Sequence, residues 1–103
     1  MVDAIVAPAQ PIPAPTIEEC LKGAVEIDGQ RTPLSSAAAP LTRGSIPFDV
    51  TGHPAICLPC GFSSAGLPVA FQIAGRSFDE ALILRVAYAY EEATTWHDRR
   101  PRL

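Results

Sequence analysis

The sequence predicts an α/β fold in which a few strands pack with one long C-terminal helix. Two apolar segments, residues 55–60 and 67–74, are separated by a Gly- and Ser-rich connection of hairpin length, so we expect them to pair as antiparallel strands. A capping box followed by a long apolar segment predicts the helix over about residues 78–94. Residues 1–103, of which 48% are hydrophobic and 18% charged, are expected to form a single packed segment.

The first part of the chain predicts a strand, a connector and a short helix. Residues 3–7, Asp-Ala-Ile-Val-Ala, form an apolar run that we interpret as a buried strand. The spaced prolines that follow deny the backbone regular pairing, so we expect an extended connector. Thr16 and Glu19 have the spacing of a capping box, which predicts a helix through about Lys22 that Gly23 ends.

The next part predicts a small hairpin and then a loop. Val25 and Ile27 alternate with polar residues up to the Asp-Gly dipeptide at 28–29, which tolerates the positive φ angles of a tight turn. Residues 31–47 hold three prolines and a Ser-Ser-Ala-Ala-Ala run. We therefore expect a loop there, with one helical turn possible over 34–39.

The two apolar strands and the C-terminal helix need cover on more sides than this chain supplies. The strands are apolar on both alternating faces, so Pro59 and Pro68 belong near strand ends or edges. The helix, expected to start at Phe78 after a capping box of Ser77 and Glu80, is apolar around almost its whole circumference. We expect the cover to come from the remainder of a larger domain or from a second copy of the chain in a homo-oligomer.

Charge and composition exclude several function classes. The formal net charge is −3 and the basic cluster is confined to Arg99, Arg100 and Arg102, which disfavours nucleic-acid binding. No apolar run has the length of a bilayer span, and Asp3 stands where a signal peptide would be basic, so we expect a cytoplasmic protein. The turn at 61–66 lacks the lysine of a phosphate-binding loop, and we expect no cofactor.

Cys57 and Cys60 have the spacing of half a zinc site or of a redox pair. Two more zinc ligands are available only at irregular distances, and a redox pair usually opens a helix, whereas this pair lies in a predicted strand. We expect no metal site and interpret the cysteines as small packing groups with reduced thiols. A small redox or metal protein remains a third, disfavoured hypothesis.

No serine has the surroundings of a nucleophile. Such a serine needs a base within hydrogen-bond reach and donors for the oxyanion. His53 is flanked by Gly and Pro in an expected turn, and His97 lies in a charged tail. The serine pairs at 35–36 and 63–64 fall in loops without a strand-to-helix elbow. The residues alone therefore indicate no catalytic group.

Residues 42–61, Thr-Arg-Gly-Ser-Ile-Pro-Phe-Asp-Val-Thr-Gly-His-Pro-Ala-Ile-Cys-Leu-Pro-Cys-Gly, closely resemble the late part of enzymes of the amidase-signature family. The family includes the amidase component of the aspartyl/glutamyl-tRNA amidotransferases and related amidohydrolases. The resemblance covers nearly the whole chain and corresponds to the C-terminal part of a family member. It extends to Asp3-Ala4-Ile5-Val6-Ala7-Pro8, Gly66-Leu67-Pro68-Val69, Gln72-Ile73-Ala74-Gly75-Arg76, Phe78-Asp79-Glu80 and Trp96-His97-Asp98-Arg99-Arg100-Pro101.

The resemblance implies a partial amidase-signature fold and a Ser–Ser–Lys triad that lies outside this sequence. In the family, the triad comes from a Gly/Ser-rich segment and an upstream lysine, whereas Lys22 is the one lysine here. We carry over no catalytic residue. The family region similar to residues 41–52 approaches the substrate pocket, which makes Thr42 and Arg43 candidates for binding the acyl side of a substrate, although Arg43 is equally suited to bracing the loop. Asp49 departs from the Asn that is frequent in the family.

Two hypotheses of different classes follow. The first is a C-terminal portion of an amide C–N hydrolase that contributes core and pocket surface and is inactive alone. The alternative is a non-catalytic interaction module that dimerises or complements a separate amidase chain.

Overall fold

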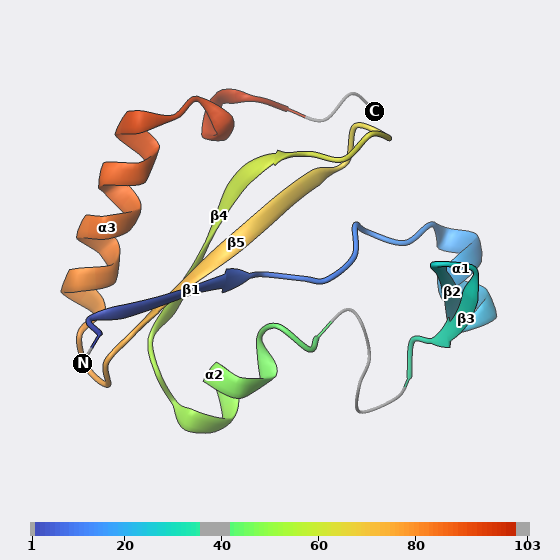
Figure 1. Cartoon of the computed structure of the whole chain (residues 1–103), viewed down its shortest axis with the longest axis horizontal. Coiled ribbons are helices and arrows are strands. Elements are labelled where there is room, and N and C mark those ends of the chain that lie inside the picture. The colour runs from blue at the N-terminus through green and yellow to red at the C-terminus, as the bar shows by residue number, and fades with distance from the viewer. Residues whose placement is uncertain (1, 36–41, 101–103) are drawn as a thin grey trace.

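The computed structural model describes residues 2–35 and 42–100, and its centre is a three-stranded antiparallel sheet (Figure 1). The antiparallel pairing predicted for the two apolar segments is confirmed, and both strands end slightly later than predicted. Pro68 opens its strand and Pro59 lies on an edge strand, as expected. In spatial order, the strands are β1 (Ala4–Pro8), β5 (Pro68–Gly75) and β4 (Ala55–Phe62).

Helix α3 (Glu80–Ala93) packs on one face of this sheet and forms the core with it (Figure 1). The buried cluster consists of Leu58, Ile73, Ile83 and Ala87. Gly75 permits the close approach, because a Cβ at this position would lie 2.6 Å from the Cγ2 of Ile83. The mixed α/β fold with a long C-terminal helix is therefore as predicted.

The predicted start of α3 is wrong. The helix begins at Glu80, and its N-cap is Asp79, whose side chain makes no capping hydrogen bond. Phe78 has a φ of 63°, a left-handed conformation that does not continue into a right-handed helix. The Asp79 N–H instead donates to the Arg76 carbonyl at 3.0 Å, which closes a turn before the helix. The expected capping box of Ser77 and Glu80 is thus replaced by a turn.

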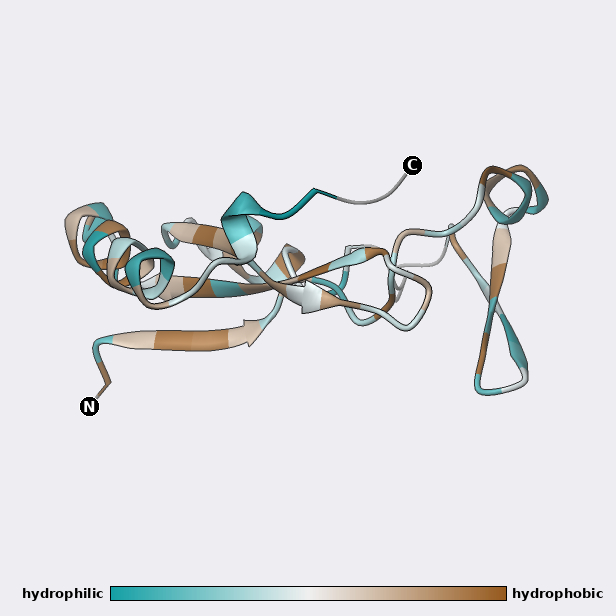
Figure 2. Ribbon diagram, turned by 90° about the horizontal axis from the view of Figure 1, so that it is seen from above, coloured by the Kyte–Doolittle hydropathy of each residue, from teal (hydrophilic) through white to brown (hydrophobic). Residues whose placement is uncertain are grey.

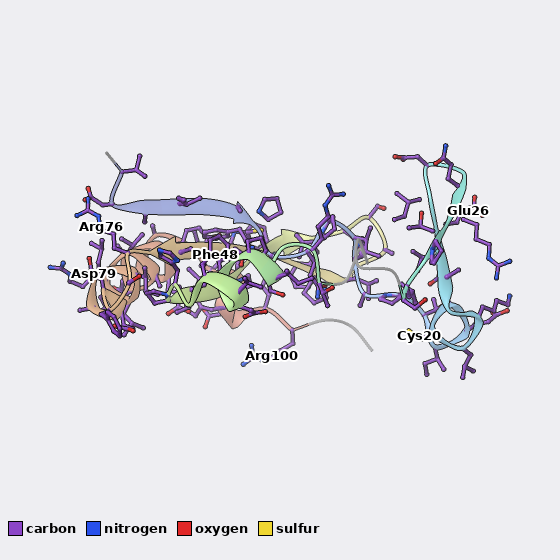
Figure 3. All side chains as sticks on the ribbon, turned by 90° about the horizontal axis from the view of Figure 1, so that it is seen from below. Cys20, Glu26, Phe48, Arg76, Asp79 and Arg100 are labelled. Atoms are coloured by element: carbon purple, nitrogen blue, oxygen red, sulfur yellow. The ribbon has the colours of Figure 1, made fainter. Side chains whose placement is uncertain are left out.

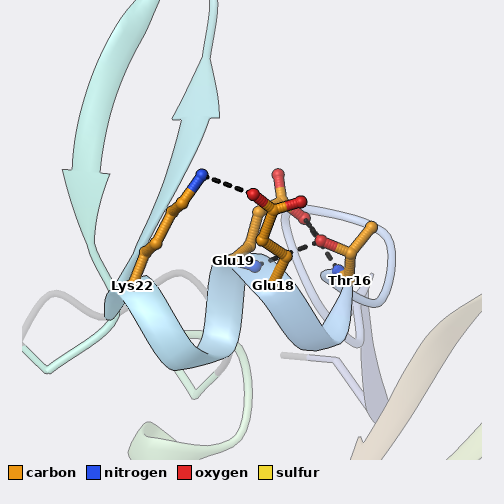
Figure 4. A network of polar contacts seen from close by, with 4 residues as sticks. All are labelled: Thr16, Glu18, Glu19 and Lys22. Atoms are coloured by element: carbon orange, nitrogen blue, oxygen red, sulfur yellow. Dashed lines mark hydrogen bonds and ion pairs between the residues drawn. The ribbon is translucent and has the colours of Figure 1, made fainter.

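A small unit lies apart from the sheet, at the far end of the proline connector, where Figure 3 labels Glu26. Its hairpin turns through Asp28 and Gly29 with φ angles of 51° and 76°, as the sequence predicts. The Thr16 capping box is also confirmed, and Figure 4 shows its hydrogen bonds. The unit comprises α1 (Ile17–Lys22), β2 (Ala24–Ile27) and β3 (Gln30–Pro33).

Helix α2 (Ile46–Thr51) corrects the expectation of an unbroken loop over residues 31–47. Pro47 lies in the first turn of α2. Backbone N–H groups in a first turn have no hydrogen-bond acceptor within the helix, so a proline there costs the helix no hydrogen bond. Gly52, with a φ of 68°, ends the helix. Strand β3 also extends into the predicted loop. The helical turn considered for 34–39 falls mostly outside the described residues.

The chain is flat and exposes more surface than a compact protein of its mass. Its accessible surface is 7440 Å², whereas a folded monomer of 10.9 kDa exposes about 5,600 Å². Its radius of gyration is 15.3 Å, against about 13 Å for a compact chain of this length. None of the described helices is long and apolar enough to cross a membrane. Large apolar side chains are exposed at Ile5, Val6, Ile17, Leu21, Val50, Leu84 and Tyr88.

Candidate functional site

The turn over residues 42–45 carries both residues that the sequence analysis selects for substrate binding. The Thr42 carbonyl accepts hydrogen bonds from the backbone N–H groups of Ser45 and Ile46, each at 3.1 Å, and from the Ser45 hydroxyl at 3.2 Å. This pattern fixes the backbone of the turn and leads into α2. The side chains of Thr42 and Arg43 are exposed, and the Arg43 guanidinium has no hydrogen bond or ion pair with any residue that the structure describes.

Gln72 in β5 anchors this turn to the sheet. Its side chain is 2% exposed and is the buried polar group of the described residues. The Nε2 of Gln72 donates to the Gly44 carbonyl at 2.6 Å and to the Pro8 carbonyl at 3.1 Å. A buried amide of this kind is stable only when its hydrogen bonds are made. One side chain therefore joins β5, the end of β1 and the turn before α2.

Gly44 lets the turn contact the chain that leaves β1. A Cβ at this position would overlap the backbone carbonyl oxygen of Ala9. The N–H of the same Ala9 donates to the Ala70 carbonyl at 3.0 Å, so this stretch of backbone is itself held against β5. A larger residue at position 44 would push the turn, with Thr42 and Arg43, away from the sheet.

A hollow of about 300 Å³ lies between β1, α2 and the end of β5, next to the Phe48 and Arg76 labelled in Figure 3. Its lining is mostly apolar. The polar groups include an ion pair between Arg76 and Asp3 at 2.8 Å and a contact between His53 Nδ1 and the Thr51 hydroxyl at 2.9 Å. All four side chains are exposed, and they form two separate pairs, Arg76 with Asp3 and His53 with Thr51.

A second hollow, of about 510 Å³, lies between the proline connector and the sheet, and Ser45 and Cys57 line it. Ser45 thus connects the candidate turn with this hollow. Thr42 and Arg43 line neither hollow. The structure brings these two predicted residues together on one turn and leaves their side chains open to solvent.

The cysteines divide into two environments. Cys60 is half-buried and its thiol lies 3.7 Å from the Val69 carbonyl, which agrees with a packing role. Cys57 is exposed, so the expectation that it serves as a buried packing group is wrong for this chain. Among residues 2–35 and 42–100, no three side chains of His, Cys, Asp or Glu gather in a way that would hold a metal ion.

Sequence reasoning gave Gln72 no role, although it is the residue that organises the site. The available signal was an amide residue within a strand whose other buried positions are Ile73, Ala74 and Gly75. A polar residue in such a run indicates a specific buried partner. The two carbonyls that it binds come from distant parts of the sequence, so the pattern alone did not identify them.

Comparisons with known proteins agree on one family. A family model described as Amidase matches residues 1–84. A glutamyl-tRNA(Gln) amidotransferase subunit from Thermodesulfovibrio yellowstonii is 47% identical over 102 residues, which are 99% of this chain and 19% of that protein. The protein of the same name from Oceanobacillus iheyensis is 42% identical over 103 residues, 98% of this chain and 18% of that protein. The chain thus spans about one fifth of the length of these curated relatives.

Two solved structures have the same arrangement of elements. The structure of 6-aminohexanoate cyclic dimer hydrolase matches with a TM-score of 0.78 and 35% identity, covering 97% of this chain and 21% of that one. A crystal structure of an amidase matches with a TM-score of 0.72 and 29% identity, covering 89% and 20%. Because the family model covers most of the chain and the fold agrees with both structures, the chain belongs to the amidase family.

Proposed function

We propose that these 103 residues act as the C-terminal portion of an amide C–N hydrolase, contributing part of its sheet and part of its substrate pocket. The observation that carries the proposal is the match to 6-aminohexanoate cyclic dimer hydrolase over 97% of this chain and only 21% of that enzyme. A segment with this coverage supplies structure to a larger catalytic domain. The nucleophilic serine and the lysine implied by the family resemblance then come from outside these residues.

In the proposed complete enzyme, the turn over residues 42–45 contacts the acyl side of the substrate. Gln72 and Gly44 hold its backbone in place, and the Arg43 guanidinium is free of protein partners among the described residues. A fixed backbone with an unpaired guanidinium suits a carboxylate-bearing ligand, because a bidentate charge-assisted hydrogen bond is both strong and directional. A cytoplasmic location is part of the same proposal.

The test is a chimera of 6-aminohexanoate cyclic dimer hydrolase in which residues 2–100 of this chain replace the matching segment. Its activity is followed by chromatography of the linear dimer that forms when water cleaves one ring amide into a carboxylate and an amine. We expect the chimera to hydrolyse the cyclic dimer. The hydrolase from which the matching segment is deleted should be inactive, and so should the isolated chain. Hydrolysis by the isolated chain, or a folded chimera without activity, would contradict the proposal.

The role of Arg43 is tested in the same chimera. We expect Arg43→Ala to raise the inhibition constant of the linear product, which bears a carboxylate, by roughly 10- to 100-fold, because it removes a charge-assisted hydrogen bond. The KM of the neutral cyclic dimer should change by less than about threefold. Arg43→Lys keeps the charge but loses the bidentate geometry of the guanidinium. Its inhibition constant for the linear product should therefore lie between those of the parent chimera and Arg43→Ala. Equal effects on both ligands would indicate that Arg43 only braces the loop.

A second candidate function is a non-catalytic module that forms a homo-oligomer or binds a separate amidase chain. The observation in its favour is the set of exposed large apolar side chains, which includes Ile5, Leu84 and Tyr88. Light scattering of the isolated chain distinguishes the candidates. A folded oligomer of defined size, together with an inactive chimera, would favour the module.

A further inference from the structure

The turn that joins β4 to β5 has hydrogen-bond donors without acceptors. The turn is closed by the Ser63 N–H, which donates to the Leu67 carbonyl at 2.8 Å, and by the Gly66 N–H, which donates to the Ser63 carbonyl at 2.9 Å. The N–H groups of Ser64 and Ala65 and the Ser64 hydroxyl make no hydrogen bond within the described part of the chain. Successive free N–H groups in a turn are a recurring component of anion-binding sites.

Arg99 lies beside this turn, where the described chain ends. It follows η1 (Trp96–Asp98), which contacts β4, and Figure 2 shows this part of the chain as a hydrophilic stretch alongside the sheet. The Arg99 guanidinium stacks on the Trp96 ring, with Cζ 4.9 Å from the ring centroid, and that ring lies 6.4 Å from the Phe62 ring at the end of β4. Stacking uses the flat face of the guanidinium. The N–H donors at its edge have no hydrogen bond with any described residue.

Arg100 is held by the backbone that precedes it. Its Nη1 donates to the His97 carbonyl at 2.9 Å and to the Arg99 carbonyl at 3.4 Å, which leaves Nε and Nη2 without a partner among the described residues. Both arginines, Phe62 and the turn line one hollow of about 630 Å³. None of the described residues that line it is acidic, and the neighbouring Asp98 pairs with His97 at 3.6 Å instead.

We infer that this turn and the two C-terminal arginines form a binding site for a phosphate group, either free phosphate or a small phosphomonoester. Guanidinium groups match phosphate oxygens with paired, charge-assisted hydrogen bonds. The turn adds two backbone N–H groups and one hydroxyl. The hollow is several times larger than a phosphate ion, which leaves room for a small organic group beside the Phe62 ring. The site shares no residue with the turn over residues 42–45, so the inference does not rest on the proposed function.

Titration of the chain with inorganic phosphate, exchanged for sodium chloride at constant ionic strength, tests the inference. Trp96 is the one tryptophan of the chain, so its fluorescence reports on this site alone. We expect the fluorescence and the NMR signals of the Ser64 and Ala65 amides to follow one saturating curve, with a dissociation constant on the order of 1 mM or below. Glycerol phosphate is titrated in the same way. Equal or tighter binding of glycerol phosphate would assign the site to a phosphomonoester, and binding of inorganic phosphate alone would assign it to the free ion.

Substitutions of the arginines test the assigned donors. Arg99→Gln and Arg100→Gln should each weaken phosphate binding by at least roughly tenfold, because each removes charge-assisted hydrogen bonds. Arg99→Lys, which keeps the charge, should weaken binding less than Arg99→Gln. Arg31→Gln on the exposed hairpin removes the same charge elsewhere and should change the dissociation constant by less than about twofold. Equal weakening by Arg31→Gln, or signals that never saturate, would overturn the inference.

Chemical modification in the hydrolase chimera gives a second readout that does not need the isolated chain to fold. Phenylglyoxal reacts with exposed guanidinium groups, and mass spectrometry of the peptides locates the modified arginines. Phosphate at about 10 mM, roughly ten times the expected dissociation constant, should slow modification of Arg99 and Arg100 by roughly tenfold, because only the unoccupied site reacts. Arg31 should react at an unchanged rate. Equal rates at Arg99 and Arg100 with and without phosphate, in a folded chimera, would overturn the site whether or not the chimera is active.

Discussion

At the scale of single residues, Gln72 decides how the candidate turn is placed. It is an amide in an otherwise apolar or glycine stretch of β5, and both of its hydrogen bonds are to backbone carbonyls of other segments. A leucine would fill a similar volume and make neither bond. The carbonyls of Pro8 and Gly44 would then lose their partner, and the turn would be held by packing alone.

We expect Gln72→Leu to lower the free energy of unfolding of the chain by about 2–3 kcal/mol, because two hydrogen bonds are lost and two carbonyls are left with no protein partner. Urea unfolding followed by circular dichroism measures the change. The matched control is Gln30→Leu on the exposed hairpin, which should change the free energy of unfolding by less than about 0.5 kcal/mol. Similar values for the two variants would show that the Gln72 bonds contribute little.

Glu19 gives a residue-scale prediction about pH. The Glu19 carboxylate accepts hydrogen bonds from the Thr16 backbone N–H at 2.7 Å and from the Thr16 hydroxyl at 2.8 Å (Figure 4). Both bonds lower the pKa of Glu19 below its ordinary value, and the backbone bond has the larger effect. A lowered pKa in the folded state means that the stabilisation is present above the ordinary value and is lost as the pH falls through the lowered one.

We therefore expect carbon-13 NMR titration to give a pKa for Glu19 below that of a Glu in an unfolded peptide. Thr16→Ala should move the pKa part of the way back up, because it removes the hydroxyl donor and keeps the backbone donor. The helical signals of α1 should weaken over the same acidic range in which Glu19 gains its proton. An unchanged pKa in the variant would mean that the hydroxyl does not bind the carboxylate in solution.

At the scale of elements, the sequence identifies those whose hydrogen bonds and patterns are local. The capping box at Thr16 and the turn at 28–29 need only neighbouring residues, and both form as predicted. The predicted start of α3 is wrong because Phe78 adopts a left-handed conformation, which a capping pattern does not reveal. Helix α2 was missed because its proline reads as a breaker, although position N1 or N2 tolerates it. The roles of Gln72 and Gly44 depend on contacts between distant segments.

Tyr90 connects α3 with the edge of β4 and provides an element-scale prediction. Its hydroxyl donates to the Pro59 carbonyl at 3.1 Å, and its ring packs edge-on against Phe71 with centroids 4.8 Å apart. Tyr90→Phe keeps the ring contact and should lower the free energy of unfolding by about 1 kcal/mol. Tyr88→Phe is the control, because Tyr88 is 64% exposed on the same helix. Equal stabilities for the two variants would remove the hydroxyl as a link between helix and sheet.

At the scale of the whole molecule, the flat shape and the uncovered apolar surface have one explanation. The chain covers one face of its sheet with α3, and leaves apolar side chains of β1 and of the outer side of α3 exposed. A small chain buries too little surface to leave such groups in water without a consequence. The relatives, about five times as long, have the additional mass that could cover these surfaces.

Leu84 allows this explanation to be tested, because it is 56% exposed on α3 and belongs to no contact of the buried cluster. Leu84→Lys should reduce self-association of the isolated chain, measured as a lower mass by light scattering, because it places a charge on an apolar surface. In the hydrolase chimera, the same change should destabilise the fold by about 2 kcal/mol or more, because the lysine would be buried there.

The test depends on two opposite effects of Leu84→Lys, which should make the isolated chain associate less and make the chimera less stable. Leu21→Lys on α1 is the control for a general effect of charge, since Leu21 is 83% exposed in the small unit away from the sheet. If Leu84→Lys leaves the chimera as stable as the parent, the outer side of α3 faces solvent in the complete domain as well. The apolar surface left for the rest of the domain to cover would then be that of β1, where Ile5 and Val6 are exposed.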